Sequence, residues 1–280
     1  MVFRMLRIAS RAGSTLLAAC ALGAAVLAGS ATTPDNHVIH DQYRLMLEDK
    51  PTNAAKVFKW GLSAWEDEFR PEVQFNSNRW ESNQPYQVGQ QIGMLTLKAG
   101  THPETVWAEA RDGVHQFGRW EARVRTRVYD HGGQPYHVFF ELVPDKGYHC
   151  GAKNIVIASY YPGQPMVQGY VRTRPDNEYR FATDPEATTE EFHTFAIEIT
   201  RQHISWFVDK HVLMTEQRPD ALSGRHYHVR FRMEGSPDPS VRMNESWLQM
   251  DWVRYYTLQR PDALPITAPE AEETTYTGGC

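Results

Sequence analysis

The chain contains 280 residues, of which 41% are hydrophobic and 22% are charged, with 3 cysteines and a formal net charge of -5. This composition excludes a disordered chain, a collagen-like fibre and a disulfide-stabilised miniprotein. A chain of this length can form one all-β domain, and its acidic balance gives no general attraction for the phosphates of a nucleic acid.

The first residues have the layout of a secretory signal peptide, over residues 1–31. Arginines precede an apolar run at residues 16–28, and small residues follow it. A membrane anchor is the alternative, but the apolar run is shorter than a spanning helix requires. We therefore expect cleavage near Ala28 or Ala31, a mature chain without a membrane span, and a secreted, periplasmic or extracellular location.

Export would leave Cys150 and Cys280 in a compartment where disulfides persist. A bridge between them, a link to a second chain and free thiols all remain open. The oligomeric state is open as well.

Polar segments flank the expected domain on both sides. Residues 32–56 are polar and are broken by Pro51, so we interpret them as a leader. Residues 259–280 are rich in Pro, Thr, Glu and Ala, which predicts a disordered tail. The folded domain is therefore expected over residues 57–258.

Alternation with a period of two dominates this domain and predicts antiparallel strands. In chain order, strands are expected at residues 93–98, 119–128, 136–142, 154–159, 167–174, 194–200, 204–208, 226–233 and 246–256. No stretch between these strands has a long helical period. The sequence therefore predicts an all-β fold of two packed sheets.

Two of these strands show the alternation most clearly. In residues 119–128, apolar side chains alternate with Arg119, Glu121 and Arg123, which predicts one face in the core and one in solvent. In residues 226–233, apolar side chains alternate with a second polar set. That set is His226, His228, Arg230 and Arg232.

Short fragments spread over the domain resemble one known family. They are WEDEF at residues 65–69, FNSNRWE at 75–81, GMLTLKA at 93–99, FGRWEAR at 117–123, FHTFAIE at 192–198, WFVD at 206–209 and MDWVRYY at 250–256. In this order they are similar to glycoside hydrolase family 16, of the laminarinase and lichenase type. The resemblance implies a concanavalin A-like jelly-roll sandwich of two antiparallel sheets, with a cleft in which a polysaccharide lies across aromatic rings.

The same resemblance implies two catalytic carboxylates on one strand, in the pattern E-x-D-x-x-E or E-x-D-x-E. The matching strand here is NIVIASY at residues 154–160, where Asn154, Val156 and Ser159 occupy the acidic positions. None of these side chains can serve as a carboxylate nucleophile or as a proton donor with a useful pKa. Three explanations compete.

The first explanation is that the catalytic acids have moved. Glu141 and Asp145 have the spacing of the shorter motif, although Pro144 indicates a strand end and a surface rim. Glu109, close to Arg111, is another acid that could reach the cleft.

The second explanation is a different reaction in a cationic groove. The groove would be formed by His226, His228, Arg172, Arg174, Arg230 and Arg232. Guanidinium groups bind carboxylated or sulfated sugars bidentately, so a lyase acting by β-elimination is conceivable. A solvated strand face is the alternative for each residue taken singly.

The third explanation is a binding protein that has kept the cleft and lost the reaction. Across these alternatives, the catalytic candidates are Glu141, Glu109, His226 and His228. The candidates for substrate binding are Trp107, Asn154, Tyr160, Arg172, Arg174, Arg230 and Arg232. We expect a polysaccharide partner, no nucleic acid, no metal site at the histidine pair and no cofactor, apart from a structural calcium compatible with the family.

Overall fold

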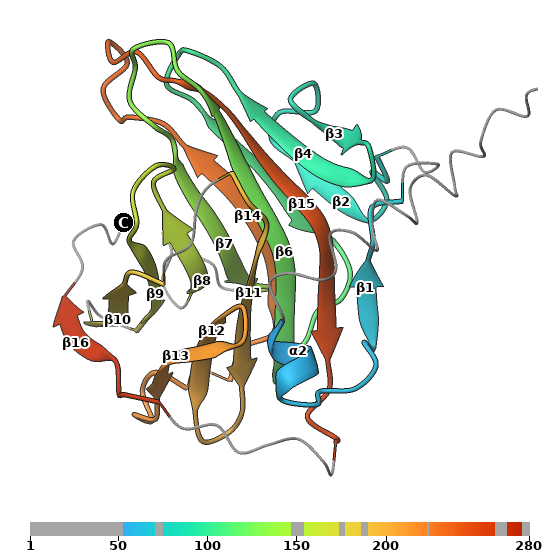
Figure 1. Cartoon of the computed structure of the whole chain (residues 1–280). Coiled ribbons are helices and arrows are strands. Elements are labelled where there is room, and N and C mark those ends of the chain that lie inside the picture. Colours follow the sequence, from blue (N-terminus) through green and yellow to red (C-terminus); the bar gives the residue numbers. More distant parts are fainter. Residues whose placement is uncertain are drawn as a thin grey trace, which may run out of the picture.

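A computed structural model describes residues 53–70, 75–146, 154–173, 177–185, 190–222, 224–260 and 268–275. Two antiparallel sheets pack face to face in it (Figure 1). This confirms the predicted jelly-roll sandwich. The predicted signal peptide, Cys150, Arg174 and Cys280 lie outside the described residues.

Sheet A contains eight strands in the order β13-β12-β11-β6-β15-β4-β3, with β1 also paired to β15. Its strands are β1 (Trp65–Asp67), β3 (Val88–Gln91), β4 (Met94–Ala99), β6 (Gly118–Tyr129), β11 (His193–Ile199), β12 (Ile204–Val208), β13 (His211–Glu216) and β15 (Glu245–Tyr256). The longest pairing joins β6 to β15, which together form the middle of the sheet.

Sheet B also contains eight strands, in the order β16-β10-β9-β8-β7-β14-β5-β2. Its strands are β2 (Trp80–Ser82), β5 (Thr105–Ala110), β7 (His137–Pro144), β8 (Ile155–Tyr160), β9 (Val167–Arg172), β10 (Asn177–Thr183), β14 (Tyr227–Glu234) and β16 (Glu272–Thr275). We call the face of this sheet that points away from sheet A the outer face of sheet B.

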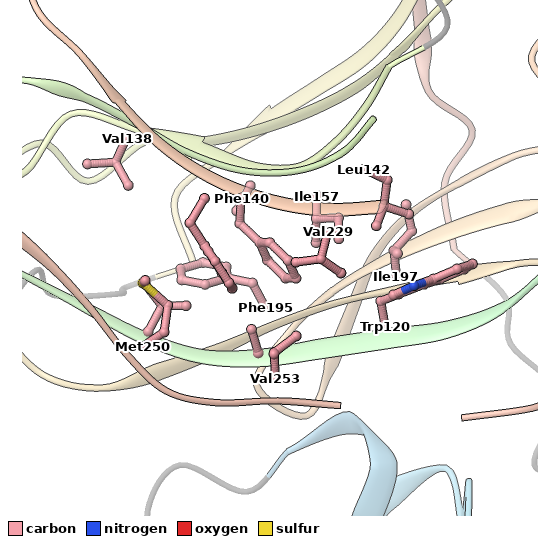
Figure 2. Close-up of a cluster of buried hydrophobic side chains, with 14 of the residues drawn as sticks. Trp120, Val138, Phe140, Leu142, Ile157, Phe195, Ile197, Val229, Met250 and Val253 are labelled. Carbon is pink, nitrogen blue, oxygen red and sulfur yellow. The ribbon is translucent and has the colours of Figure 1, made fainter. Parts of the chain in front are cut away.

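The core lies between the two sheets and is formed by the apolar half of each alternating strand (Figure 2). Trp120 and Phe195 of sheet A meet Phe140, Leu142 and Val229 of sheet B there. All five side chains are almost completely buried. Because side chains alternate along a strand, filling this core leaves the polar half of β7 and β14 on the outer face of sheet B.

Each strand that the alternation predicts is present. Seven strands lie outside the expected set, and all of them are at or beside a sheet edge, where burial and therefore alternation are weaker. These are β1, β2, β3, β5, β10, β13 and β16.

The prediction that one face of β6 is solvated is wrong for its first half. Arg119, Glu121 and Arg123 are all buried. A second layer on sheet A, formed by the short helix α2 (Ala54–Val57) and Trp60, covers Arg119 and Glu121. Arg123 lies against the Phe192 ring and pairs with Asp251. Residues 53–56, expected at the end of the leader, are therefore part of the packed structure.

Glu121 binds the start of this helix. Its carboxylate accepts hydrogen bonds from Asn53 Nδ2 at 3.0 Å and from the Ala55 backbone N–H at 3.2 Å. Burial raises the pKa of Glu121 from 4.5 to about 7, against the opposing effect of these hydrogen bonds and of Arg254. A buried, titratable carboxylate thus supports the layer over sheet A.

The C-terminal segment departs from the expected disordered tail. Strand β16 pairs with β10 of sheet B, while Glu270 forms a bridge to Thr215 in β13 of sheet A. Arg218 adds ion pairs to Glu216, Glu270 and Glu273. The segment, which we call the C-terminal clasp (residues 268–275), therefore contacts both sheets.

In the described part of the chain, no helix is both long enough and apolar enough to cross a bilayer.

We predict that Glu121→Gln changes the dependence of stability on pH. Because the pKa of Glu121 is raised in the folded state, its contribution to stability is complete below its unfolded value of 4.5 and is lost as the pH rises through about 7. Relative to wild type, the variant should gain roughly 3 kcal/mol between about pH 5 and pH 8. Urea unfolding across this range measures the difference.

The matched control is Glu191→Gln, since Glu191 is exposed. It should keep the wild-type pH profile. Parallel profiles for wild type and Glu121→Gln would contradict the prediction.

Candidate functional site

The outer face of sheet B carries a row of charged side chains across three neighbouring strands. Strand β14 lies between β5 and β7, and its residue Arg230 is in register with Glu109 of β5 and Glu141 of β7. Alternation points Tyr227, Val229 and Phe231 of β14 into the core. The polar side chains of β14 therefore share the outer face, as the alternation predicts.

Glu141 is the centre of this row. Its Oε1 atom accepts hydrogen bonds from Arg230 Nε at 2.8 Å and from Arg232 Nε at 2.9 Å. Its Oε2 atom lies 3.4 Å from Asn154 Nδ2. The side chain is only 2% exposed. Both carboxylate oxygens are thus occupied by groups of the protein.

Glu109 and Glu234 extend the row on either side. Arg230 lies 3.7 Å from Glu109, and Arg232 also pairs with Glu234. We call Glu109, Glu141, Arg230, Arg232 and Glu234 the outer-face ion row. Positive and negative groups alternate along it, so the charges that the sequence places in a cationic groove are compensated by acids.

The central acid of the row, Glu141, and the terminal acid Glu109 have opposite pKa shifts. Burial raises the pKa of Glu141, but the attraction of Arg232 and Arg230 outweighs it, and the net pKa is lowered. Burial also raises the pKa of Glu109, and the attraction of Arg230 and His228 offsets this only in part. Glu141 is therefore held as a carboxylate, while Glu109 takes up a proton more readily.

Strand β8 and the residue before it carry Asn154, Val156 and Ser159, the positions that the sequence resemblance aligns with acids. Val156 faces Glu141 and Ser159 faces Phe139 across the β7–β8 pairing, and the register shifts between the two pairs. Ile157 and Ala158 both belong to the core as a result. This bulge keeps Val156 and Ser159 on the same, outer face despite their odd spacing.

The side chains at these positions are buried and non-acidic. Val156 packs with Phe139 and Tyr170 in a small apolar cluster on the outer face. Within the described residues, Ser159 Oγ and Asn154 Oδ1 are buried and have no hydrogen-bond partner. Asn154, Val156 and Ser159, which we call the β8 row, thus consist of an amide, an apolar side chain and a hydroxyl.

Tyr160 points into the core, so its prediction as a substrate-binding residue is wrong. Its hydroxyl lies 2.7 Å from Thr126 Oγ1 of sheet A, and its ring stacks with Phe195 in the core. The bulge in β8 explains the difference, because it directs the residue after Ser159 inward.

Aromatic side chains lie along the same face. Trp107 is beside Arg232 on the outward half of β5 and is partly exposed. Tyr161 is 40% exposed and stacks on His137 with ring centroids 4.3 Å apart. Burial, with a smaller effect from Arg232, lowers the pKa of His137 to about 4, so this ring is neutral at physiological pH.

His137 and Tyr161 are not among the site residues predicted from the sequence. The signal for His137 was present, because His137, Phe139 and Glu141 alternate with apolar residues on β7. Tyr161 follows the end of β8, outside any alternating pattern.

Arg172 lies farther along the face, on β9. Its Nε atom donates to Glu178 Oε2 at 2.8 Å, and its guanidinium group lies over the Tyr170 ring at 4.7 Å. Arg172, like the arginines of the outer-face ion row, is therefore paired with an acid.

The predicted histidines lie at the opposite end of the face. His228 is on the outward half of β14, with Nδ1 2.8 Å from the Ala110 carbonyl oxygen and Nε2 3.0 Å from Asp145 Oδ1. His226 precedes the strand and is exposed. Asp145 thus pairs with a histidine and does not form a carboxylate pair with Glu141, which the relocated motif requires.

Among the described residues, no group of three or more His, Cys, Asp or Glu side chains is arranged to hold a metal ion.

Removing the charge of Glu141 should destabilise the fold. Glu141→Gln leaves Arg230 and Arg232 without their shared counter-charge, and we expect a loss of about 3 kcal/mol in the free energy of unfolding. The control Glu234→Gln removes the half-exposed partner of Arg232 and should cost less than about 1 kcal/mol. Equal stability of the two variants in urea would show that the buried ion pairs contribute little.

Comparison with known proteins identifies a family to which part of this chain is similar. The family model described as Glycosyl hydrolases family 16 matches residues 153–241, and no curated protein matches the chain. The matched part begins just before β8. The resemblance to this family, stated above from sequence fragments, is confirmed.

Solved structures of laminarinases share the fold. The laminarinase from Rhodothermus marinus has a TM-score of 0.57 at 18% identity, over 70% of this chain and 96% of that one. The laminarinase catalytic domain from Thermotoga maritima has a TM-score of 0.55 at 14% identity, over 71% and 99%. The laminarinase from Flavobacterium sp. UMI-01 has a TM-score of 0.55 at 17% identity, over 70% and 100%.

Proposed function

We propose that this chain, which has the fold of family 16 laminarinases, is an exported protein that holds a polysaccharide on the outer face of sheet B without cleaving it. The observation that carries the proposal is the β8 row. The sequence resemblance aligns Asn154, Val156 and Ser159 with the family's acids, and the register of β7 and β8 is consistent with Val156 and Ser159 sharing the outer face.

Hydrolysis with retention requires a nucleophile and an acid about 5–5.5 Å apart on either side of the scissile bond. Glu141, the acid nearest to the β8 row, is buried and has both oxygens engaged. A buried carboxylate with both oxygens hydrogen-bonded cannot attack the anomeric carbon of a sugar. The ion row is better understood as a support for the binding face than as a catalytic pair.

Binding of sugars fits the remaining features of the face. The partly exposed rings of Trp107 and Tyr161 offer flat apolar surfaces, and sugar rings bury such surfaces while their hydroxyls reach polar edges. The compensated charges of the ion row supply donors and acceptors for hydroxyl groups. A polymer with many hydroxyls could therefore contact several strands at once.

One observation favours hydrolysis as a second candidate. The raised pKa of Glu109 and the lowered pKa of Glu141 are the opposite shifts expected of a proton donor and a nucleophile. The burial of Glu141 decides against this candidate, because a nucleophile must reach the sugar carbon. The Glu141 side chain is 2% exposed, whereas that of Glu109 is 23% exposed.

The first test is incubation of the purified mature protein with laminarin, lichenan, agarose and polygalacturonate. We expect at least one polymer to be retained by the immobilised protein, with no new reducing ends and no unsaturated uronate. New reducing ends that disappear in Glu109→Gln would establish hydrolysis with relocated acids. Absorbance of unsaturated uronate would establish a lyase, and absence of any retention would reject the proposal.

The second test removes the aromatic rings. Trp107→Ala and Tyr161→Ala should each weaken binding by up to about tenfold, the factor that corresponds to 1.4 kcal/mol. Tyr86→Ala is the control, because Tyr86 is fully exposed and precedes β3 of sheet A. Affinity electrophoresis in the retained polymer measures the effect, and an equal loss in the control would refute a specific role for the two rings.

A further inference from the structure

A pocket lies beyond the end of the outer-face ion row, next to His228. Its volume is about 490 Å³. It is lined by Val114, Asp145, Lys146, Gly224, Arg225 and His226. We call it the β14 pocket, because Gly224, Arg225 and His226 lead directly into that strand.

Three chain segments meet at this pocket and fix its shape. The Asp145 backbone N–H donates to the His226 carbonyl oxygen at 2.8 Å, which joins the end of β7 to the start of β14. His115 and Tyr227 exchange backbone hydrogen bonds at 3.0 and 3.3 Å, which brings the segment before β6 to the other side. The walls are thus held by main-chain contacts.

The charges in the pocket differ from those of the ion row. Asp145, its acid, pairs with His228 Nε2 at 3.0 Å. Within the described part of the chain, no acid forms an ion pair with Lys146, Arg225 or His226. Each arginine of the ion row, by contrast, has a carboxylate partner. Lys146 and Arg225 therefore give the pocket positive charge that is not paired with a carboxylate of the described residues.

We propose that the β14 pocket binds a carboxylate or sulfate group of an acidic polysaccharide that lies along the outer face of sheet B. The inference rests on the proposed function and names its substrate class. Arg225 can bind such a group bidentately, while Lys146 acts as a flexible point charge.

The position of the pocket argues for a polymer as the source of the anionic group. His228 connects the pocket to the row, because it contacts Asp145 on one side and the strand of Glu109 on the other. A chain on the outer face can thus place neutral sugar rings over the compensated row and one anionic group in the pocket. The protein has a formal net charge of -5, so a general attraction for polyanions does not explain such binding.

The experiment compares two triple variants of the full mature chain. The pocket variant is Lys146→Ala, Arg225→Ala and His226→Ala. The control variant removes the same residue types elsewhere, as Lys210→Ala, Arg242→Ala and His211→Ala. All six residues are exposed, so both proteins should fold, and thermal unfolding checks this.

Polygalacturonate and dextran sulfate are the acidic probes, laminarin and lichenan are the neutral ones, and free galacturonate tests for a monomer site. We expect wild type and control to bind at least one acidic polymer, and the pocket variant to bind it about tenfold or more weakly, as for lost charge-assisted hydrogen bonds. The salt dependence of binding should also decrease in the pocket variant. Neutral polymers should bind both variants alike.

The outcomes separate this inference from the proposed function. Retention of neutral polymers alone, or equal loss of acidic binding in both variants, would overturn the inference and leave the proposed function standing. Free galacturonate binding as tightly as the polymer would overturn the polysaccharide as the occupant. Failure of wild type to bind any polymer would overturn both.

Discussion

The carboxylate of Glu141, shared between Arg230 and Arg232, is the interaction on which the outer face of sheet B depends. A buried charge is costly unless it is paired and hydrogen-bonded, and here two guanidinium groups and an amide meet one carboxylate. The pairing ties β7 to β14 and β8 through their side chains. It also sets the electrostatics of the face, because arginines that are committed to Glu141 are no longer available as a cationic groove.

The two sheets differ in how the charged residues on their outer faces are accommodated. Sheet A also has charged residues on the face turned away from the core, at Arg119, Glu121 and Arg123, but a helix and aromatic rings cover them. On sheet B, Trp107 and Tyr161 remain partly open. The outer face of sheet B therefore has aromatic rings open to a polysaccharide, whereas the outer face of sheet A is covered at Arg119, Glu121 and Arg123.

Much of the fold could be predicted from the sequence, because alternation along β6, β7 and β14 requires only a core on one side. The outward positions of Glu141, Glu109 and Arg230 follow from the same pattern. Alternation could not show the bulge in β8, which turns Tyr160 into the core. It also could not show which charges pair, since the partners of Arg230 lie on strands distant in the sequence.

The layer over sheet A and the C-terminal clasp could not be predicted from the sequence for a similar reason. Short segments such as residues 53–57 and 268–275 carry no period of their own. Their structure depends on surfaces that exist only after the sheets have formed, such as the buried carboxylate of Glu121 and the open sides of β10 and β13.

The clasp also has a consequence for association between molecules. Strand β13 ends sheet A, and β10 would end sheet B if β16 did not pair with it. The backbone N–H and C=O groups of an open edge are a template for strands of another copy. A chain cut at residue 258 would leave β10 as the edge of sheet B and would remove the bridge to Thr215 in β13. Residues 268–275 therefore move the edge of sheet B from β10 to the short strand β16, which carries Glu272 and Glu273. Short edge strands with charged side chains resist pairing with another copy.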